Sequence, residues 1–216
     1  MKLLVLSNVK ALPQPLALLS PLVEDHDPDA LVVLGGLFPP SPSPSHNPSA
    51  GGQPRPVKKG KKGEDDPSEV VTQLNWLTRP VFVVPDSSDL QMPKLVKKVQ
   101  GQDLVFLRWI QAKGSPLDGW LFVGGGAGMT ASDVGKLVGQ YELLAPGQVI
   151  VLLSGLEQAL LPEVANPALV LVGPSTPVPS NAGWVVQVGD VGEKGAVTLV
   201  DIEEKTTEEL LVGLKV

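Results

Sequence analysis

Short runs of apolar residues recur along the whole chain, and each run is bounded by Gly, Pro or a polar turn. Within a run the apolar character is continuous and does not alternate with polar residues, which is typical of strands covered on both faces. We therefore expect a core built mainly of fully buried strands. The runs read KLLVL, ALVVLGG, VFVVP, DLVFLRW, GWLFVGG, QVIVLLS, ALVLVG, GWVVQVG and GAVTLVDI.

Segments with a helical spacing of apolar residues lie between several of these runs. An alternation of strands and helices predicts a layered α/β domain. In the second half of the chain, strands and turns follow each other more closely, which predicts that the sheet finishes in antiparallel hairpins. The predicted helices span residues 16–23, 68–77, 92–99 and 130–144.

Prolines and short polar residues predict where these helices begin. Pro21 removes a backbone donor from the first helix, so we expect a kink at this point or a later start of the helix. Pro67 suits the first turn of the second helix. The residues that can cap the amino ends of the second and the last helix are Asp66 or Ser68, and Thr130 or Ser132.

The chain of 216 residues has the size of one domain. We expect residues 1–216 to form a single domain with a disordered insertion at 40–66. The insertion is rich in Pro, Ser, Gly and Lys and holds one sizeable aliphatic residue, Val57, so it cannot bury enough apolar surface to offset its ordering entropy. We interpret it as a solubilising spacer or, alternatively, as a docking tail whose lysines bind an acidic partner.

Charge and cysteine content exclude several classes of function. A net charge of -6 and a pI of about 4.9 argue against direct binding to nucleic acid, which needs Lys and Arg. The chain has no cysteine, which excludes disulfides, thiolate metal sites and a cysteine nucleophile. No stretch approaches the roughly 20 apolar residues of a membrane span, and polar residues interrupt the apolar start before a signal-peptide core forms. We expect a soluble, cytoplasmic protein that binds a protein partner with a basic surface.

Polar or glycine-containing turns follow the apolar runs, at the place where open α/β sheets bind their ligands. In chain order these turns read SNVK, GGLF, PDSSD, SGLEQ and GPSTPVP. Their order and spacing resemble the calcineurin-like metallophosphoesterases, whose corresponding turns read D-x-H, G-D, G-N-H-D, an isolated His and G-H-x-H. The resemblance covers nearly the whole chain, and it implies an α/β fold that is a four-layer α/β/β/α sandwich with mixed sheets.

The residues that hold metal ions in that family are replaced in this chain. In the third motif Asp89 alone keeps its residue type, and the resemblance gives it the role of supporting a catalytic histidine that is here Ser88. The resemblance thus implies a degenerate member with a vestigial site. The positions of that site are Asn8 and Lys10 in the first motif, Gly36 in the second, Ser87, Ser88 and Asp89 in the third, Ser154 or Gly155 for the isolated histidine, and Pro174 and Thr176 in the last.

These replacements argue against the family's chemistry. A two-metal hydrolytic site lowers the pKa of a bridging water with cations roughly 3.5–4 Å apart, and such cations need carboxylate and imidazole ligands. Gly36 and Pro174 offer neither, and Lys10 brings a positive charge. The two histidines, His26 and His46, lie before the second strand and in the insertion. We predict no metal, no cofactor and no catalytic residue.

The resemblance also implies a role for a degenerate member, since others in the family serve as small subunits of replicative polymerases and in the retromer coat. We predict a catalytically inactive protein-interaction or scaffolding subunit. One alternative is a phosphoesterase that hydrolyses phosphodiesters or phosphomonoesters with an altered site. The other is a sensor that binds a small ligand or nucleotide in the vacated pocket.

Two further patterns bear on these alternatives. A lysine can activate a serine nucleophile, and a glycine-rich turn between a strand and a helix, as in FVGGGAGMTASD, can bind phosphate through backbone N–H groups. There is no G-x-S-x-G elbow, and Met129 stands where G-x-G-x-x-G needs its last glycine. Turn residues that satisfy local backbone groups are the simpler interpretation. The serines that could lie near Lys10 are Ser87, Ser88, Ser154 and Ser175.

Four tryptophans stand out in a chain with few other aromatics. Core packing is the expected role of each. Trp109, however, lies on an alternating stretch that predicts an exposed edge strand, and Arg108 precedes it. Because Trp and Arg are frequent anchors of protein interfaces, we predict a partner surface at Arg108 and Trp109.

Overall fold

The computed structural model of the chain describes residues 1–9, 15–37, 67–90, 106–157, 166–174, 176–179, 183–191 and 195–212. Several predicted features lie outside these residues. They are the insertion at 40–66, the helix at 92–99, Lys10, His46, Asp66 and Ser175.

Six of the described strands form one mixed sheet. Strands β1 to β4 run parallel to one another, β10 pairs antiparallel with β1, and β11 pairs antiparallel with β10. The antiparallel β10–β11 hairpin confirms the prediction that the sheet finishes in this way, although β11 lies outside the predicted apolar runs. In spatial order the sheet consists of β11 (Thr206–Leu211), β10 (Ala196–Asp201), β1 (Lys2–Leu6), β2 (Ala30–Leu34), β3 (Val81–Val84) and β4 (Leu107–Trp109).

Five further described strands form a second sheet. Strands β6 to β9 are parallel, and β5 joins β6 as an antiparallel edge strand. The order is β5 (Lys113–Leu117), β6 (Trp120–Gly125), β7 (Val149–Leu153), β8 (Leu169–Val172) and β9 (Val185–Gln187). Every apolar run of the sequence contains one of the strands in these sheets, whereas β5 and β11 were not predicted. Both are edge strands with few buried residues.

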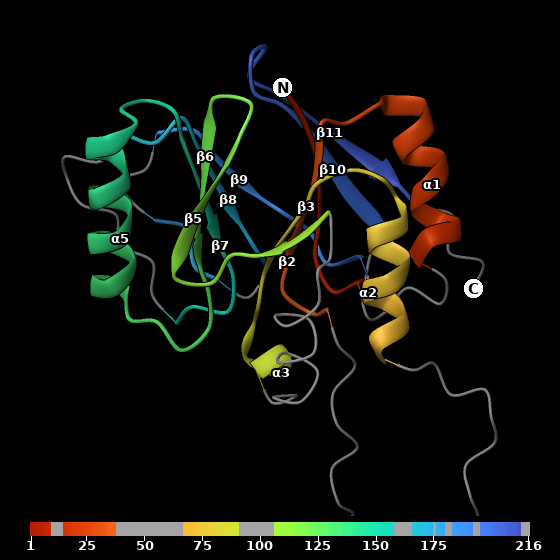
Figure 1. Cartoon of the computed structure of the whole chain (residues 1–216), viewed down its shortest axis with the longest axis horizontal. Helices are drawn as coiled ribbons and strands as arrows, with labels where there is room; N and C mark the ends of the chain where they lie inside the picture. Colours follow the sequence, from red (N-terminus) through yellow and green to blue (C-terminus); the bar gives the residue numbers. More distant parts are fainter. Residues whose placement is uncertain are drawn as a thin grey trace, which may run out of the picture.

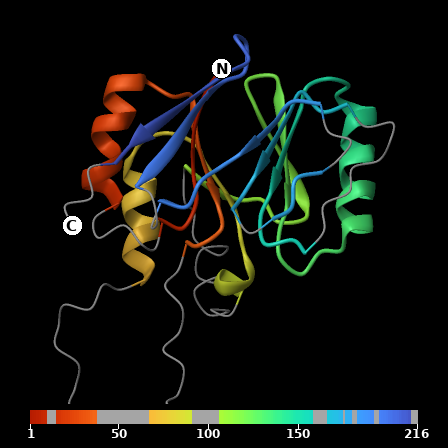
Figure 2. The same ribbon diagram turned by 180° about the vertical axis from the view of Figure 1, so that it is seen from behind.

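The two sheets pack face to face, and helices cover their outer faces (Figures 1 and 2). Helices α1 (Pro15–His26) and α2 (Pro67–Trp76) lie against the six-stranded sheet, and α5 (Ala131–Leu144) lies against the five-stranded one. The short α3 (Ser87–Leu90) follows β3. This is the predicted four-layer α/β/β/α sandwich. None of the helices in the described segments has the length and apolar character needed to cross a membrane.

Alternate side chains of the central strands enter different layers of the core. Leu4 and Leu6 of β1 pack with the helices α1 and α2, whereas Leu3 and Val5 pack between the two sheets. In that inner layer, Phe82 and Phe122 stack with their ring centroids 4.1 Å apart. The strands β1, β2, β3, β7 and β8 have almost every residue buried, which confirms the prediction of strands covered on both faces.

Helix α1 continues through Pro21. The helix begins at Pro15, so the alternative of a later start is wrong. Pro21 and Ala17, one turn earlier, are both exposed. Water can therefore solvate the carbonyl that the missing N–H of Pro21 leaves without a helical partner.

Thr130 caps α5, as predicted, within a complete capping box. The Thr130 hydroxyl accepts from the backbone N–H of Asp133 at 3.2 Å, and the Asp133 carboxylate accepts from the backbone N–H of Thr130 at 3.2 Å and from its hydroxyl at 2.7 Å. The hydrogen bonds from the Thr130 side chain and backbone hold the pKa of Asp133 below its ordinary value. These hydrogen bonds stabilise the folded chain at pH values above the ordinary carboxyl pKa. The stabilisation is lost as the pH falls through the lowered pKa of Asp133.

We expect Thr130→Ala to lower the free energy of unfolding by about 1 kcal/mol at neutral pH, because the cap is removed. The pKa of Asp133 should rise towards its ordinary value in the same variant. Urea denaturation and an NMR pH titration of the Asp133 carboxyl measure the two effects. Ser132→Ala, in the same turn, is the control and should change stability by less than about 0.5 kcal/mol; equal losses in both variants would contradict the assignment.

Candidate functional site: the rim of the two sheets

The carboxyl ends of the parallel strands of both sheets meet at one edge of the molecule, which we call the rim. In Figure 1 it lies at the bottom, beside α3. Backbone hydrogen bonds fix the turns that follow the strands to their neighbours. The N–H of Asn8, after β1, donates to Gly35 O at 2.9 Å, and the N–H of Gly35, after β2, donates to Val84 O at 2.8 Å. Most of the positions predicted for the vestigial site therefore belong to one connected surface.

The turns of the two sheets touch at Gly35, Asp86 and Ser154. A Cβ atom on Gly35 would lie 2.6 Å from Ser154 Oγ and 2.8 Å from Asp86 Cβ, and Gly35 has a φ of +75°. A Cβ atom on Gly155 would lie 2.9 Å from Asp86 Cα. Asp86 thus fills the space between a turn of one sheet and a turn of the other. A residue larger than glycine at position 35 would displace Asp86.

Asn8 and Gly36 make a second close contact at the rim. Asn8 has a φ of +56°, a conformation that Asn tolerates better than most residues, and its Nδ2 donates to Asp190 Oδ1 at 2.7 Å. A Cβ atom on Gly36, whose φ is +67°, would lie 2.6 Å from Asn8 Cα. Asn8 Oδ1 is buried without a hydrogen-bond partner. The aspartate that the resembling family has at position 36 would collide with the backbone of Asn8.

The turn after β3 uses its polar groups to cap α3. Asp86 Oδ1 accepts from the Ser88 N–H at 2.8 Å, from the Ser88 hydroxyl at 2.6 Å and from the Asp89 N–H at 3.0 Å. Asp89 is completely buried and accepts from the Asp86 N–H at 3.2 Å. Ser87 is exposed at the surface. The carboxylates of this turn are thus engaged with the turn itself.

The turns after β7 and β8 are also tied to each other. Ser154 and Thr176 are buried, and Thr176 Oγ1 accepts from the Leu156 N–H at 3.3 Å. Pro174 is exposed. Ser154 and Gly155 therefore lie against the turn after β3, and Thr176 binds the next residue of their own turn, Leu156.

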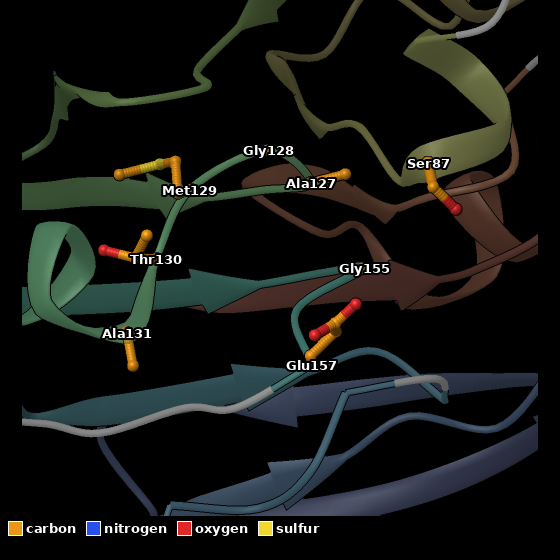
Figure 3. A pocket seen from close by; sticks show the side chains of 8 residues that line it. All are labelled: Ser87, Ala127, Gly128, Met129, Thr130, Ala131, Gly155 and Glu157. Carbon is orange, nitrogen blue, oxygen red and sulfur yellow. The ribbon is translucent and has the colours of Figure 1, made fainter.

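A pocket of about 440 Å³ opens beside this contact (Figure 3). In Figure 3, Ser87 lies on one side of it and Met129 to Ala131 on the other, with Glu157 between them. The glycine-rich turn singled out in the sequence therefore does line a pocket at the rim. The lining residues are Ser87, Ala127, Gly128, Met129, Thr130, Ala131, Gly155 and Glu157.

Sequence reasoning missed three acidic residues of the rim: Asp86, Asp190 and Glu157. Asp86 directly precedes Ser87 in the turn PDSSD, and Asp190 ends the run GWVVQVGD. Attention to every carboxylate after a predicted strand would have found both. Glu157 lies three residues beyond Ser154, in a turn read only for its serine and glycine.

The described side chains of the rim do not fit a pair of divalent cations. Such a pair requires several carboxylate and imidazole ligands around shared oxygens. In the described part of the chain, no three His, Cys, Asp or Glu side chains are grouped as metal ligands. The Asp86 carboxylate is engaged in the cap of α3, and Gly36 and Pro174 have no ligand atom in their side chains. His26 is the last residue of α1.

The predicted exposure of Trp109 is wrong. Its side chain is 6% exposed and packs in the core between α1, α2 and the six-stranded sheet. Arg108, on the opposite face of β4, donates to Pro116 O at 2.7 Å and lies 5.5 Å from the centroid of the Phe82 ring. β4 is an edge strand, but the helices cover the face that carries Trp109. Arg108 joins the edges of the two sheets.

Solved structures of other proteins share this architecture, although no protein-family model and no curated protein matches the chain. TT1561 of Thermus thermophilus superimposes with a TM-score of 0.64 and 19% identity over 98% of each chain. An archaeal phosphodiesterase superimposes with a TM-score of 0.50 and 11% identity, over 97% of this chain and 99% of its own.

At these levels of identity the likeness concerns the fold. The described residues form an α/β/β/α sandwich. Its two mixed sheets and the helices that cover them confirm the predicted fold class, and TT1561 shares this architecture.

We expect Gly36→Ala to lower the free energy of unfolding by about 3–4 kcal/mol, because a left-handed backbone and a collision with Asn8 both oppose the new Cβ. Gly119→Ala is the matched control, since Gly119 has a φ of +83° but a Cβ atom added to it would have nothing within 4 Å. Gly119→Ala should lower the free energy of unfolding by only about 1–2 kcal/mol, because only the left-handed backbone opposes the new Cβ. Urea denaturation compares the two, and equal losses would show that the Asn8 contact does not constrain the rim.

Proposed function

We propose that this chain is a cytoplasmic protein-interaction or scaffolding subunit with a metallophosphoesterase-type fold, and that it does not hydrolyse phosphoesters. The observation that carries the proposal is the engagement of Asp86, whose Oδ1 accepts three hydrogen bonds from its own turn. The turns that would have to surround a substrate phosphate instead pack on one another.

The chemistry of two-metal hydrolysis explains why this observation matters. The reaction needs a bridging water whose pKa is lowered by cations, and those cations need unshared carboxylate or imidazole ligands. Opening the rim to admit them would break the cap of α3 and separate Gly35 from Asp86 and Ser154. Each buried polar group left without a partner would then cost about 1–3 kcal/mol.

The interaction half of the proposal is supported by two properties of the chain. Three clusters of buried apolar side chains form the core, so residues on the surface can serve partner binding without being needed for folding. The net charge of -6 favours partners with basic surfaces, because complementary charge speeds encounter and disfavours wrong partners.

A second candidate function is small-ligand sensing, and the pocket beside Ser87 favours it. Its volume of about 440 Å³ lies in the range of ligand pockets. The exposed carboxylates of Glu157 and Asp133 disfavour an anionic ligand there. Isothermal titration with ATP and with inorganic phosphate tests the candidate: we expect no heat of binding, and a saturable signal lost in Gly128→Trp would establish the sensor.

We expect no manganese-dependent hydrolysis of bis(p-nitrophenyl) phosphate by the purified protein, measured as release of p-nitrophenol. Asp89→Asn removes the one carboxylate that matches the family's motif. Asp118→Asn is the matched control, since Asp118 is exposed in the turn between β5 and β6. A manganese-dependent rate that survives in Asp118→Asn and disappears in Asp89→Asn would overturn the proposal and establish the phosphoesterase alternative.

The partner itself is sought by affinity capture from native lysate with the whole chain and with a variant lacking residues 40–66. A protein retained by both baits binds the folded domain, and one retained by the whole chain alone binds the insertion. Capture of no protein by either bait at physiological salt would contradict the scaffolding role.

A further inference from the structure

We propose that a pocket between the carboxyl ends of α1 and α2 binds an arginine- or lysine-bearing segment of a protein partner. This inference rests on the proposed interaction function and gives it a surface and a partner chemistry. We call the pocket the Trp76 pocket. Its lining residues are Ser20, Val23, Glu24 and Asp27 at the end of α1, and Trp76, Leu77, Thr78 and Arg79 at the end of α2.

The Trp76 pocket lies at the edge of the sheet opposite the rim. A helix that connects two parallel strands runs back from the carboxyl end of one to the amino end of the next. The ends of α1 and α2 therefore approach the starts of β2 and β3, away from α3 (Figure 1). The pocket has a volume of about 270 Å³, which is enough for one long side chain but small for a cofactor.

Trp76 is exposed because it lies off the apolar face of α2. Val71, Leu74 and Leu77 are buried at helical spacing, and Trp76 is about 200° around the helix from Leu74. Its side chain is 65% exposed. An indole left in water contributes little to the fold, whereas Trp is among the residues that most often dominate the energy of a protein interface.

Other large apolar side chains are exposed in the described segments, but they do not line this or the rim pocket. They are Leu143, Leu144, Val178 and Leu211. Trp76 differs from them because it combines an aromatic face, a cavity and neighbouring charge. The combination of Trp and Arg that the sequence suggested at positions 108 and 109 is found here instead, at Trp76 and Arg79.

The charges around the Trp76 pocket favour a cation. Arg79 forms an ion pair with Asp27, which neutralises one carboxylate of the lining. Glu24 is exposed and makes no ion pair with any described residue. The carboxyl ends of two helices add partial negative charge at the same place. A guanidinium or ammonium group can therefore lie over the indole of Trp76 while it pairs with Glu24, as in cation–π recognition.

A second copy of the chain is a less suitable occupant. Two copies that meet through this surface would bring their Glu24 side chains and helix ends towards each other, and like charges across an interface oppose association. A basic segment of another protein meets no such repulsion. Self-association is nevertheless a separate outcome of the test below.

The test is an NMR titration of the ¹⁵N-labelled full chain with a short Gly/Ser peptide carrying arginines, and with the same peptide carrying glutamates. We expect the arginine peptide to shift the Trp76 indole N–H and the backbone signals of Glu24 and Arg79, and the glutamate peptide to leave them unchanged. Trp76→Ala should weaken binding about tenfold, as the loss of a desolvated cation–π contact, and Glu24→Gln should weaken it less. Leu143→Ala, which removes another exposed side chain, should bind as the wild type does.

Several results would overturn this inference. They are an absence of shifts at the Trp76 pocket, equal binding of both peptides, or unchanged affinity in Trp76→Ala. Concentration-dependent dimerisation that Trp76→Ala abolishes would assign the surface to a second copy instead. Urea denaturation should show that Trp76→Ala keeps its stability within about 0.5 kcal/mol. Hydrolytic activity at the rim would contradict the proposed function but would not change the peptide titration. Failure of the proposed function can therefore be distinguished from failure of this inference.

Discussion

Burial of the central strands on both faces is the constraint on which the rest of the structure depends. Each sheet must be covered by helices on one side and by the other sheet on the second side, because its strands are apolar throughout. Phe82 from one sheet and Phe122 from the other stack across the inner layer, 4.1 Å apart. This packing brings the turns at the carboxyl ends of the two sheets into contact at Gly35, Asp86 and Ser154. The core therefore contributes to the spacing of the rim.

The chemistry of the rim follows from that spacing. Glycine is required at positions 35 and 36, because a Cβ atom there would meet Ser154 Oγ or Asn8 Cα at 2.6 Å. A glycine at each position also offers no side-chain ligand to a cation. Asp86 remains, but its carboxylate stabilises the start of α3. Its Oδ1 accepts three hydrogen bonds from this turn, which fix the orientation of the carboxylate.

The sequence predicted the parts of the fold whose residues are buried on both sides, and it failed where burial is partial. KLLVL or VIVLL can only be a strand in a core, so the layers followed from such runs. The edge strand β5, KGSPL, has too little apolar character to be distinguished from a turn. Trp109 was misjudged because the alternation of a three-residue strand does not show which of its faces a helix covers. The expected core packing of Trp76 was also wrong, since its side chain is 65% exposed. The spacing of Val71, Leu74 and Leu77 places Trp76 off the buried face of α2, and this spacing was not used.

The two edges of the sandwich differ in what they leave unsatisfied. At the rim, the turns are joined by hydrogen bonds and close packing, and only Asn8 Oδ1 among the described rim atoms is buried without a partner. At the opposite edge, the ring of Trp76 is exposed to water, and the Glu24 carboxylate of the same pocket forms no ion pair with any described residue. Binding of a cationic group that covers both the exposed ring and the carboxylate is favourable, because one contact removes the ring from water and pairs the charge. The Trp76 pocket, and not the rim, is therefore the place at which we expect this chain to recognise a basic partner.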